Sequence, residues 1–170
     1  MSLDGSYDLN RETYNGELTL SRFPLDRFLT VDSLGSASAN FRLEGRYFSW
    51  PQAKTSVNAG IRQLFYKEHE YKDITLQATL DKTHLRGTMV SKDPDAPLDL
   101  VFRGDSLQQQ YQVGLGGYIG KVDLQALHLM QEPLTMGLKV DLQGFIGEHS
   151  AYALKARFDS LSMADSRKTY

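Results

Sequence analysis

The sequence predicts an all-β protein, built as a curved, mostly antiparallel sheet with one or two very short helices. Three observations predict this fold class. Apolar and polar residues alternate with a period of two along much of the chain, and turn-forming residues separate the alternating segments. The centres of these segments recur roughly every 9 to 15 residues, a rhythm typical of antiparallel hairpins and meanders.

Residues 134–142 carry the clearest strand pattern, because their even-numbered positions are apolar and their odd-numbered positions are not. A helix would scatter Met136 and Val140 away from the other apolar residues, whereas a strand places all of them on one face. The same alternation predicts strands around residues 74–80, 98–102, 111–115 and 152–158, and weaker ones around 7–9, 18–20 and 41–43.

Turn chemistry falls between these strands. Asn15-Gly16 predicts a hairpin turn because both residues tolerate a positive φ. Residues 81–84 and 144–150 also read as breaks, and the two prolines of residues 93–97 oppose both helix and ladder pairing.

Two short segments favour a helix. Residues 23–29 have a proline near a first turn and apolar residues on one side, and Asp123 is placed to cap a single turn over residues 123–127. Residues 58–66 fit either a helix or a strand.

Composition excludes several classes of function. The chain has 170 residues, 19 basic and 21 acidic side chains and a net charge of −2, without a basic run, which argues against a nucleic-acid partner. It has no cysteine, which excludes disulfides and thiol chemistry. No apolar run approaches the ~18 residues of a membrane span.

We expect no catalytic residues. Residues 104–107 spell the GDSL motif of a hydrolase family, but the helices of that fold are missing and the Asp-x-x-His of residues 81–84 precedes Ser106 instead of following it. We therefore interpret Ser106 as part of a turn at a strand end.

We also expect no metal ion and no cofactor. The 4 histidines are far apart in the sequence, and residues 68–70 read as a solvated charged segment. Asp93 and Asp95 fit a proline-containing turn better than a calcium loop, whose full set of ligands is missing.

The predicted strands share an apolar face, and the physical problem is how that face is covered. Large exposed apolar patches are rare on monomers, because leaving one leucine in water costs about 1.5–3 kcal/mol. A second sheet, closure of the sheet on itself, or a ligand with long apolar chains would each cover it.

Several segments together resemble a repeat unit of the AsmA/TamB superfamily, most closely the long TamB-like (translocation and assembly module) proteins of the Bacteroides group. The unit comprises residues 5–9, 15–20, 23–29, 34–38 and 43–45, and residues 71–76 and 122–127 look like further repeats. The abrupt start and end of the pattern lead us to expect a single β-rich segment, residues 1–170, excised from a longer repetitive protein, with residues 1–3 as an added leader, and the resemblance agrees with this expectation.

The resemblance also implies a place and a task. Members of the family are anchored in the inner membrane of Gram-negative bacteria and cross the periplasm. Their sheet is folded lengthwise into a taco-like half-pipe with an apolar interior. This groove guides phospholipid acyl chains, or unfolded outer-membrane protein segments, toward the outer membrane, and an outer-membrane barrel partner is contacted through regions outside this segment.

We therefore expect a non-catalytic conduit for lipid transport and outer-membrane biogenesis. The alternative is a scaffold domain with a closed core that acts through protein–protein contacts. The edge strands around residues 7–9 and 152–158 also predict edge-to-edge self-association. The predicted groove lining is Leu18, Leu20, Phe41, Leu43, Ile74, Leu76, Leu80, Leu100, Val113, Leu138, Val140, Leu154 and Phe158.

Overall fold

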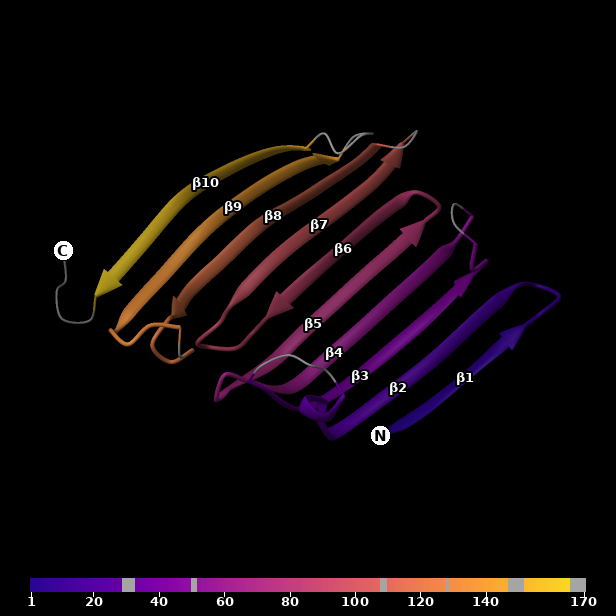
Figure 1. Cartoon of the computed structure of the whole chain (residues 1–170), viewed down its shortest axis with the longest axis horizontal. Coiled ribbons are helices and arrows are strands. Elements are labelled where there is room, and N and C mark those ends of the chain that lie inside the picture. The colour runs from indigo at the N-terminus through magenta and orange to yellow at the C-terminus, as the bar shows by residue number, and fades with distance from the viewer. Residues whose placement is uncertain (29–32, 50–51, 108–109, 128, 147–151, 166–170) are drawn as a thin grey trace.

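The protein is described by a computed structural model that covers residues 1–28, 33–49, 52–107, 110–127, 129–146 and 152–165. Over these residues the chain forms one 10-stranded antiparallel sheet (Figure 1). Its elements are β1 (Ser2–Asp8), β2 (Thr13–Pro24), a 3-10 turn η1 (Leu25–Arg27), β3 (Leu34–Arg46), β4 (Lys54–Tyr66), β5 (His69–Asp81), β6 (His84–Ser91), β7 (Leu98–Leu107), β8 (Gln110–Asp123), β9 (Leu134–Ile146) and β10 (Tyr152–Asp165). The predicted all-β fold class is confirmed.

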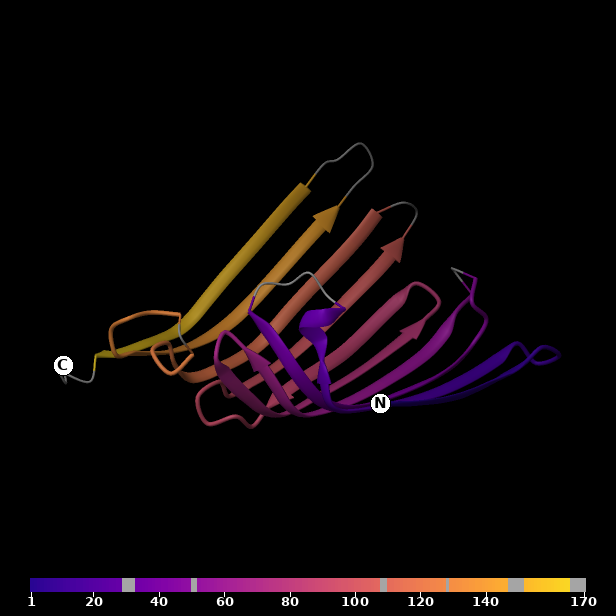
Figure 2. The same cartoon turned by 60° about the horizontal axis from the view of Figure 1, so that its bottom comes forward.

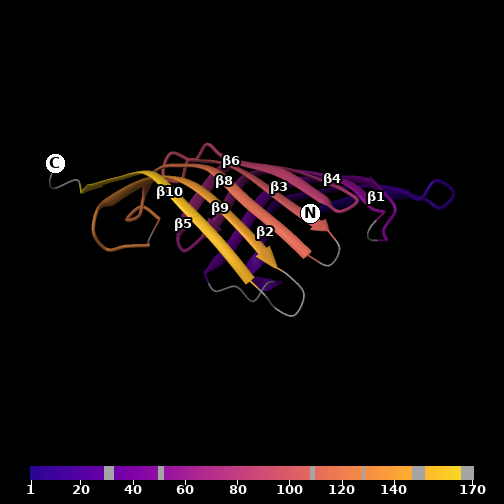
Figure 3. The same cartoon turned by 90° about the horizontal axis from the view of Figure 1, so that it is seen from above.

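The strands follow one another across the sheet in chain order, so each strand pairs with its neighbours in sequence. Figures 2 and 3 show a single bent layer. The sheet is neither closed nor strongly curled, so it differs from the predicted half-pipe in its degree of curvature. β1 and β10 lie at opposite ends of the strand order and no ladder joins them in the described sheet, which is why the sheet is not closed.

The first hairpin turn is not where the sequence predicted it. Asn15 and Gly16 lie inside β2, where Gly16 pairs with Gly5 on one side and Leu43 on the other. The chain turns instead between Asp8 and Thr13. There the Asp8 carboxylate accepts hydrogen bonds from the backbone N–H groups of Asn10 and Arg11. This side-chain-stabilised turn outweighs the turn propensity of Asn-Gly.

The two predicted helical segments form only turns. Residues 25–27 make a 3-10 turn, and Leu29 lies outside the described residues. Asp123 caps its turn as predicted: its Oδ1 atom accepts hydrogen bonds from the N–H groups of Gln125 and Ala126 at 2.9 and 3.0 Å. The ambiguous residues 58–66 are strand, within β4.

Bulges bend the strands at one end of the sheet. Extra residues are inserted in β2 between Leu20 and Phe23, and in β8 between Ile119 and Val122, with similar shifts in the β3–β4 and β9–β10 ladders. In the β2 bulge, Arg22 has a φ of 45° and donates its N–H to the Ser38 hydroxyl at 3.0 Å. Bulges increase local bending and twist.

The small buried core lies at this same bent end. Ala96, Val122 and Leu127 form it, and Tyr71 and Ile119 pack against it. Ala96 belongs to the β6–β7 connection and Leu127 to the β8–β9 connection, so both connections cover this end of the sheet. Within the described residues, the structure contains no helix with the length and apolar character needed to cross a membrane.

Candidate functional site

The strand pairing assembles a continuous row of apolar residues across the whole sheet. Paired residues in an antiparallel ladder point to the same face, so the row follows directly from the register. At ~4.8 Å per strand, this row is roughly 40 Å long. One residue comes from each strand: Leu3, Leu18, Phe41, Ala59, Leu76, Met89, Leu100, Gly117, Val140 and Phe158.

Parallel rows flank the central row, because residues two positions away in each strand share its face. Toward the bent end the flanking row is Leu20, Ala39, Ile61, Ile74, Ser91, Leu98, Ile119 and Leu138. Toward the other end it is Leu43, Val57, Ala78, Gly87, Phe102, Leu115, Leu142 and Ala156, followed by a row with Leu80, Leu85, Val113 and Leu154. We call the side of the sheet with these rows the apolar face, and none of the residues named in these rows is charged.

The register brings every predicted lining residue to the apolar face. The central row contains Leu18, Phe41, Leu76, Leu100, Val140 and Phe158. The flanking rows contain Leu20, Ile74, Leu138, Leu43, Leu80, Val113 and Leu154. Three further residues, Met89, Phe102 and Leu115, lie on the same face and are missing from the predicted lining. Phe102 and Leu115 belong to the alternating runs of residues 98–102 and 111–115, so the sequence pattern already indicates their face, whereas Met89 is identified by its ladder pairing with Leu76.

Burial on this face falls from the bent end toward the other end. Leu20 and Ile74 in the first flanking row are 6% and 7% exposed, whereas Val113 and Leu154 in the last row are 48% and 77% exposed. No second sheet covers the face within the described residues. The result is an apolar strip that is shielded at one end of the strands and open to solvent at the other.

Two glycines of the rows on the apolar face, Gly87 and Gly117, stand at positions where the structure leaves no space for a side chain. A Cβ at Gly87 would overlap the Phe102 ring and lie 2.7 Å from the Gln77 carbonyl oxygen. Gly117 has a φ of +147°, and a Cβ there would overlap the Asp99 carbonyl oxygen. A side chain at either position would therefore displace backbone or the aromatic ring.

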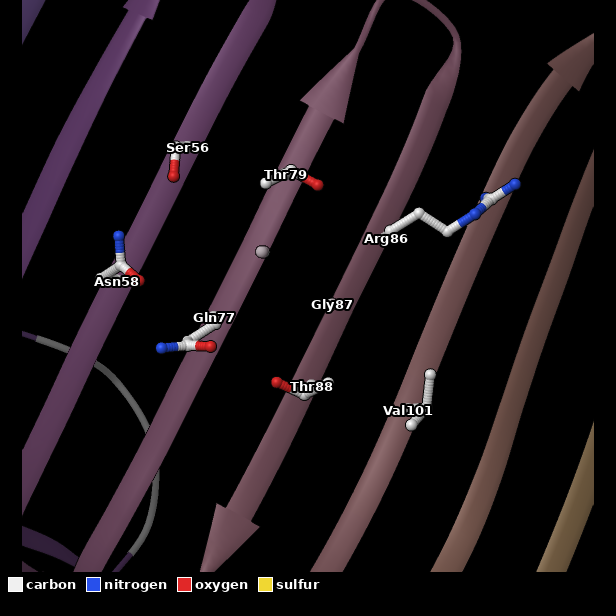
Figure 4. Close-up of a pocket in the computed structure, with 9 residues that line it drawn as sticks. Ser56, Asn58, Gln77, Thr79, Arg86, Gly87, Thr88 and Val101 are labelled. Carbon is white, nitrogen blue, oxygen red and sulfur yellow. The ribbon is translucent and has the colours of Figure 1, made fainter.

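The opposite face is polar and is crossed by ion pairs between neighbouring strands. Arg42 pairs with Glu17 at 3.6 Å, and Lys54 pairs with Asp81 at 3.2 Å. A hollow of about 340 Å³ on this face lies between side chains of β4 to β7 (Figure 4). Its labelled lining consists of Ser56, Asn58, Gln77, Thr79, Arg86, Gly87, Thr88 and Val101.

Asp105 joins two partners on the polar face. Its Oδ1 atom lies 2.6 Å from His84 Nδ1 and 2.9 Å from Arg86 Nη2. Ser106 is the next residue of β7, so its side chain leaves the opposite face of the sheet. The geometry thus separates the Ser106 hydroxyl from the only imidazole that Asp105 holds in the described residues.

Replacing Asp105 by asparagine is expected to lower stability at neutral pH by at most about 1 kcal/mol, because the pairs are partly exposed. The hydrogen bond from Arg86, then that from His84, lowers the pKa of the Asp105 carboxyl. A lowered folded-state pKa stabilises the protein above the unfolded-state value, and this contribution is lost as pH falls through the folded-state value. Urea unfolding at pH 7 and at pH 2.5 should therefore show a difference between Asp105→Asn and wild type that is smaller at the lower pH.

The described fold defines an open, single-layer β-sheet with one apolar and one polar face. Comparison of the chain with protein-family models, with curated proteins and with solved structures found no match.

Proposed function

We propose that this chain is a non-catalytic segment that guides lipid acyl chains along its apolar face. The observation that supports the proposal most is the apolar row that crosses all ten strands without a charged residue. The row runs perpendicular to the strands, in the direction in which strands are added. A flexible hydrocarbon chain lying along it would contact a new strand every ~4.8 Å.

Movement along such a track requires contacts that are weak, repeated and non-directional. Aliphatic side chains supply contacts of this kind through the hydrophobic effect, whereas hydrogen-bonding groups would hold the ligand at fixed positions. The gradient of exposure also fits, because the shielded end leaves one side of the strip closed while the other admits chains from solvent.

In the proposed setting, the sheet is one wall of a taco-like half-pipe in a periplasmic protein of a Gram-negative bacterium, anchored in the inner membrane. The resemblance to the AsmA/TamB superfamily supports this setting. Stronger curling of the sheet, by further strands or around the bound chains, would complete the half-pipe. Unfolded outer-membrane protein segments are the other cargo that this family implies.

Lipid binding can be tested with two variants of one strand. Val113 lies on the apolar face and Tyr118 on the polar face of β8, and their exposed fractions are nearly equal at 48% and 51%. Val113→Asp should reduce loading of a fluorescent phosphatidylethanolamine several-fold, because a carboxylate is placed beside the acyl chain. Tyr118→Asp carries the same charge and should leave loading unchanged.

Native mass spectrometry of the purified full chain gives the second measurement, and phospholipid should be detected bound to the wild-type protein. Absence of lipid binding by both methods would overturn the proposal. Equal loss of loading in Val113→Asp and Tyr118→Asp would also contradict it, because the effect would then not depend on the face. Capture of an unfolded barrel segment instead of lipid would replace the cargo with a polypeptide.

A further inference from the structure

A second group of residues meets at the bent end of the sheet. His69 begins β5, and Asp93 and Asp95 lie in the connection between β6 and β7. One nitrogen of His69 and one carboxylate oxygen from each aspartate all lie within 4.8 Å of one another. The side chains of His69 and Asp93 are 11% and 2% exposed, so these two lie under the surface, whereas Asp95 is half-buried.

The hydrogen bonding of His69 fixes which ring nitrogen is available. Nδ1 lies 3.1 Å from the Ala126 carbonyl oxygen, which can only accept, so Nδ1 carries the hydrogen. In the neutral ring Nε2 then has a free lone pair. Nε2 is buried without a hydrogen-bond partner, and its distance of 3.7 Å from Asp93 Oδ2 is too long for a hydrogen bond. An imidazole whose Nδ1–H binds a backbone carbonyl is the form that ligates metals through Nε2.

Asp93 is held in place by the backbone. Its Oδ2 accepts the N–H of Lys72 at 2.8 Å and its Oδ1 accepts the N–H of Asp95 at 2.9 Å. A carboxylate offers about four acceptor sites, so free lone pairs remain on Asp93. The ammonium group of Lys72 forms an ion pair with the Glu70 carboxylate at 2.9 Å.

The geometry of the cluster leaves room for a cation. Nε2 of His69 is buried without a hydrogen-bond partner, and the oxygen atoms that approach it belong to the side chains of Asp93 and Asp95. A divalent ion among these atoms would satisfy His69 Nε2 and would be held by both carboxylates.

We propose that His69, Asp93 and Asp95 form a binding site for a divalent transition-metal ion, with Zn²⁺ as the ion that fits best. One imidazole with two carboxylates favours such ions over Ca²⁺ and Mg²⁺, which prefer oxygen ligands alone. Ligand atoms around tetrahedral Zn²⁺ lie roughly 3.3 Å apart, so the three side chains close by about 1.5 Å at most. A water molecule would complete the coordination.

The position of the site assigns it a structural role, independent of lipid guiding. The ion would join the start of β5 to the β6–β7 connection. Through Ala126, which holds the His69 ring, it would also stabilise the β8–β9 connection. These connections contribute the buried residues Ala96 and Leu127 that cover one end of the apolar face.

The test uses the full chain, first dialysed against a chelator and then titrated with ZnCl2 by calorimetry. One saturable site per chain is expected, together with a rise in melting temperature on Zn²⁺ addition. His69→Gln and Asp95→Asn should each weaken Zn²⁺ binding by more than about 100-fold, since loss of even an outer-shell partner costs 10–100-fold. His84→Gln is the matched control, because His84 contacts Asp105 on the polar face and should leave the affinity unchanged.

Co²⁺ gives an independent readout, because its visible absorption reports coordination by nitrogen and oxygen ligands of the chain. The absence of saturable Zn²⁺ binding by the wild-type chain would overturn the proposal. Unchanged affinity in His69→Gln would overturn it as well. An imidazolium–carboxylate ion pair is the competing interpretation, and it predicts that His69→Gln lowers the melting temperature equally with and without Zn²⁺.

Discussion

Ile74→Asp is expected to lower the free energy of unfolding by about 4 kcal/mol or more. Ile74 is 7% exposed and lies between Ile61 and Ser91 on the apolar face. The variant loses the burial of an isoleucine, worth about 2 kcal/mol, and places a carboxylate without a charged partner among apolar side chains. Urea unfolding followed by circular dichroism measures the effect.

The deficit of Ile74→Asp should grow with pH. Burial raises the pKa of the new carboxyl in the folded state above the ordinary value of about 3.9. Between these two values the unfolded chain releases a proton that the folded chain keeps, so stability falls by about 1.4 kcal/mol per pH unit and is constant above the raised value.

Thr75→Asp is the control for this prediction, because Thr75 is the next residue of β5 and its side chain leaves the exposed polar face. It should change stability by less than about 0.5 kcal/mol. Equal destabilisation by the two substitutions would show that the faces of the sheet are not distinguished in solution.

Self-association through the sheet edges is the second large expected effect. β1 and β10 each pair with one neighbour in the described sheet, so each presents an unpaired row of backbone groups. Leu154 and Phe158 on β10 are 77% and 59% exposed, which adds apolar contact to the strand pairing. Light scattering with size-exclusion chromatography should show dimers or longer assemblies as concentration rises.

Proline substitutions on β10 separate edge pairing from other association. Successive N–H groups of a strand point to opposite sides, so of Lys155→Pro and Ala156→Pro one removes the outward donor and the other breaks the pairing with β9. The variant that removes the outward donor should be folded and monomeric. The variant that breaks the pairing with β9 should be destabilised. Association that persists in a folded proline variant would mean that the apolar face, rather than the edge, holds the copies together.

The sequence predicts the faces of this sheet better than its turns. Alternation over residues 134–142 identifies both β9 and the face of Leu138 and Val140, because the period-two pattern is a direct consequence of strand geometry. The hairpin turn predicted at Asn15-Gly16 is wrong, because turn propensity is a local preference that strand pairing can outweigh. The pairing of Tyr7 with Tyr14, together with the Asp8 side chain, moves the turn away from it.

The cluster around His69 lies beyond simple pattern reading, because His69 and Asp93 are distant in sequence. Their approach depends on the register of the β5–β6 hairpin, which turns at Lys82 with a φ of 58°. Counting outward from that turn, past the pair Ile74 and Ser91, brings the start of β5 beside Asp93. The sequence predicts the turn at residues 81–84, so the register could have been counted from it. His69 was instead interpreted together with its charged neighbours, residues 68–70, as a solvated segment.

The pairing of the strands in chain order determines how stability is distributed over the sheet. Since every strand forms its backbone ladders only with its predecessor and successor in the described sheet, the sheet behaves approximately as a one-dimensional array whose stability is close to a sum of strand terms and nearest-neighbour interfaces. Hydrogen exchange should then show protection that is highest for β4 to β8 and decays toward both lateral edges. Contacts of this local kind also carry a small loop-closure entropy, so hairpins can add one at a time to a growing sheet, and folding should be fast for an all-β protein.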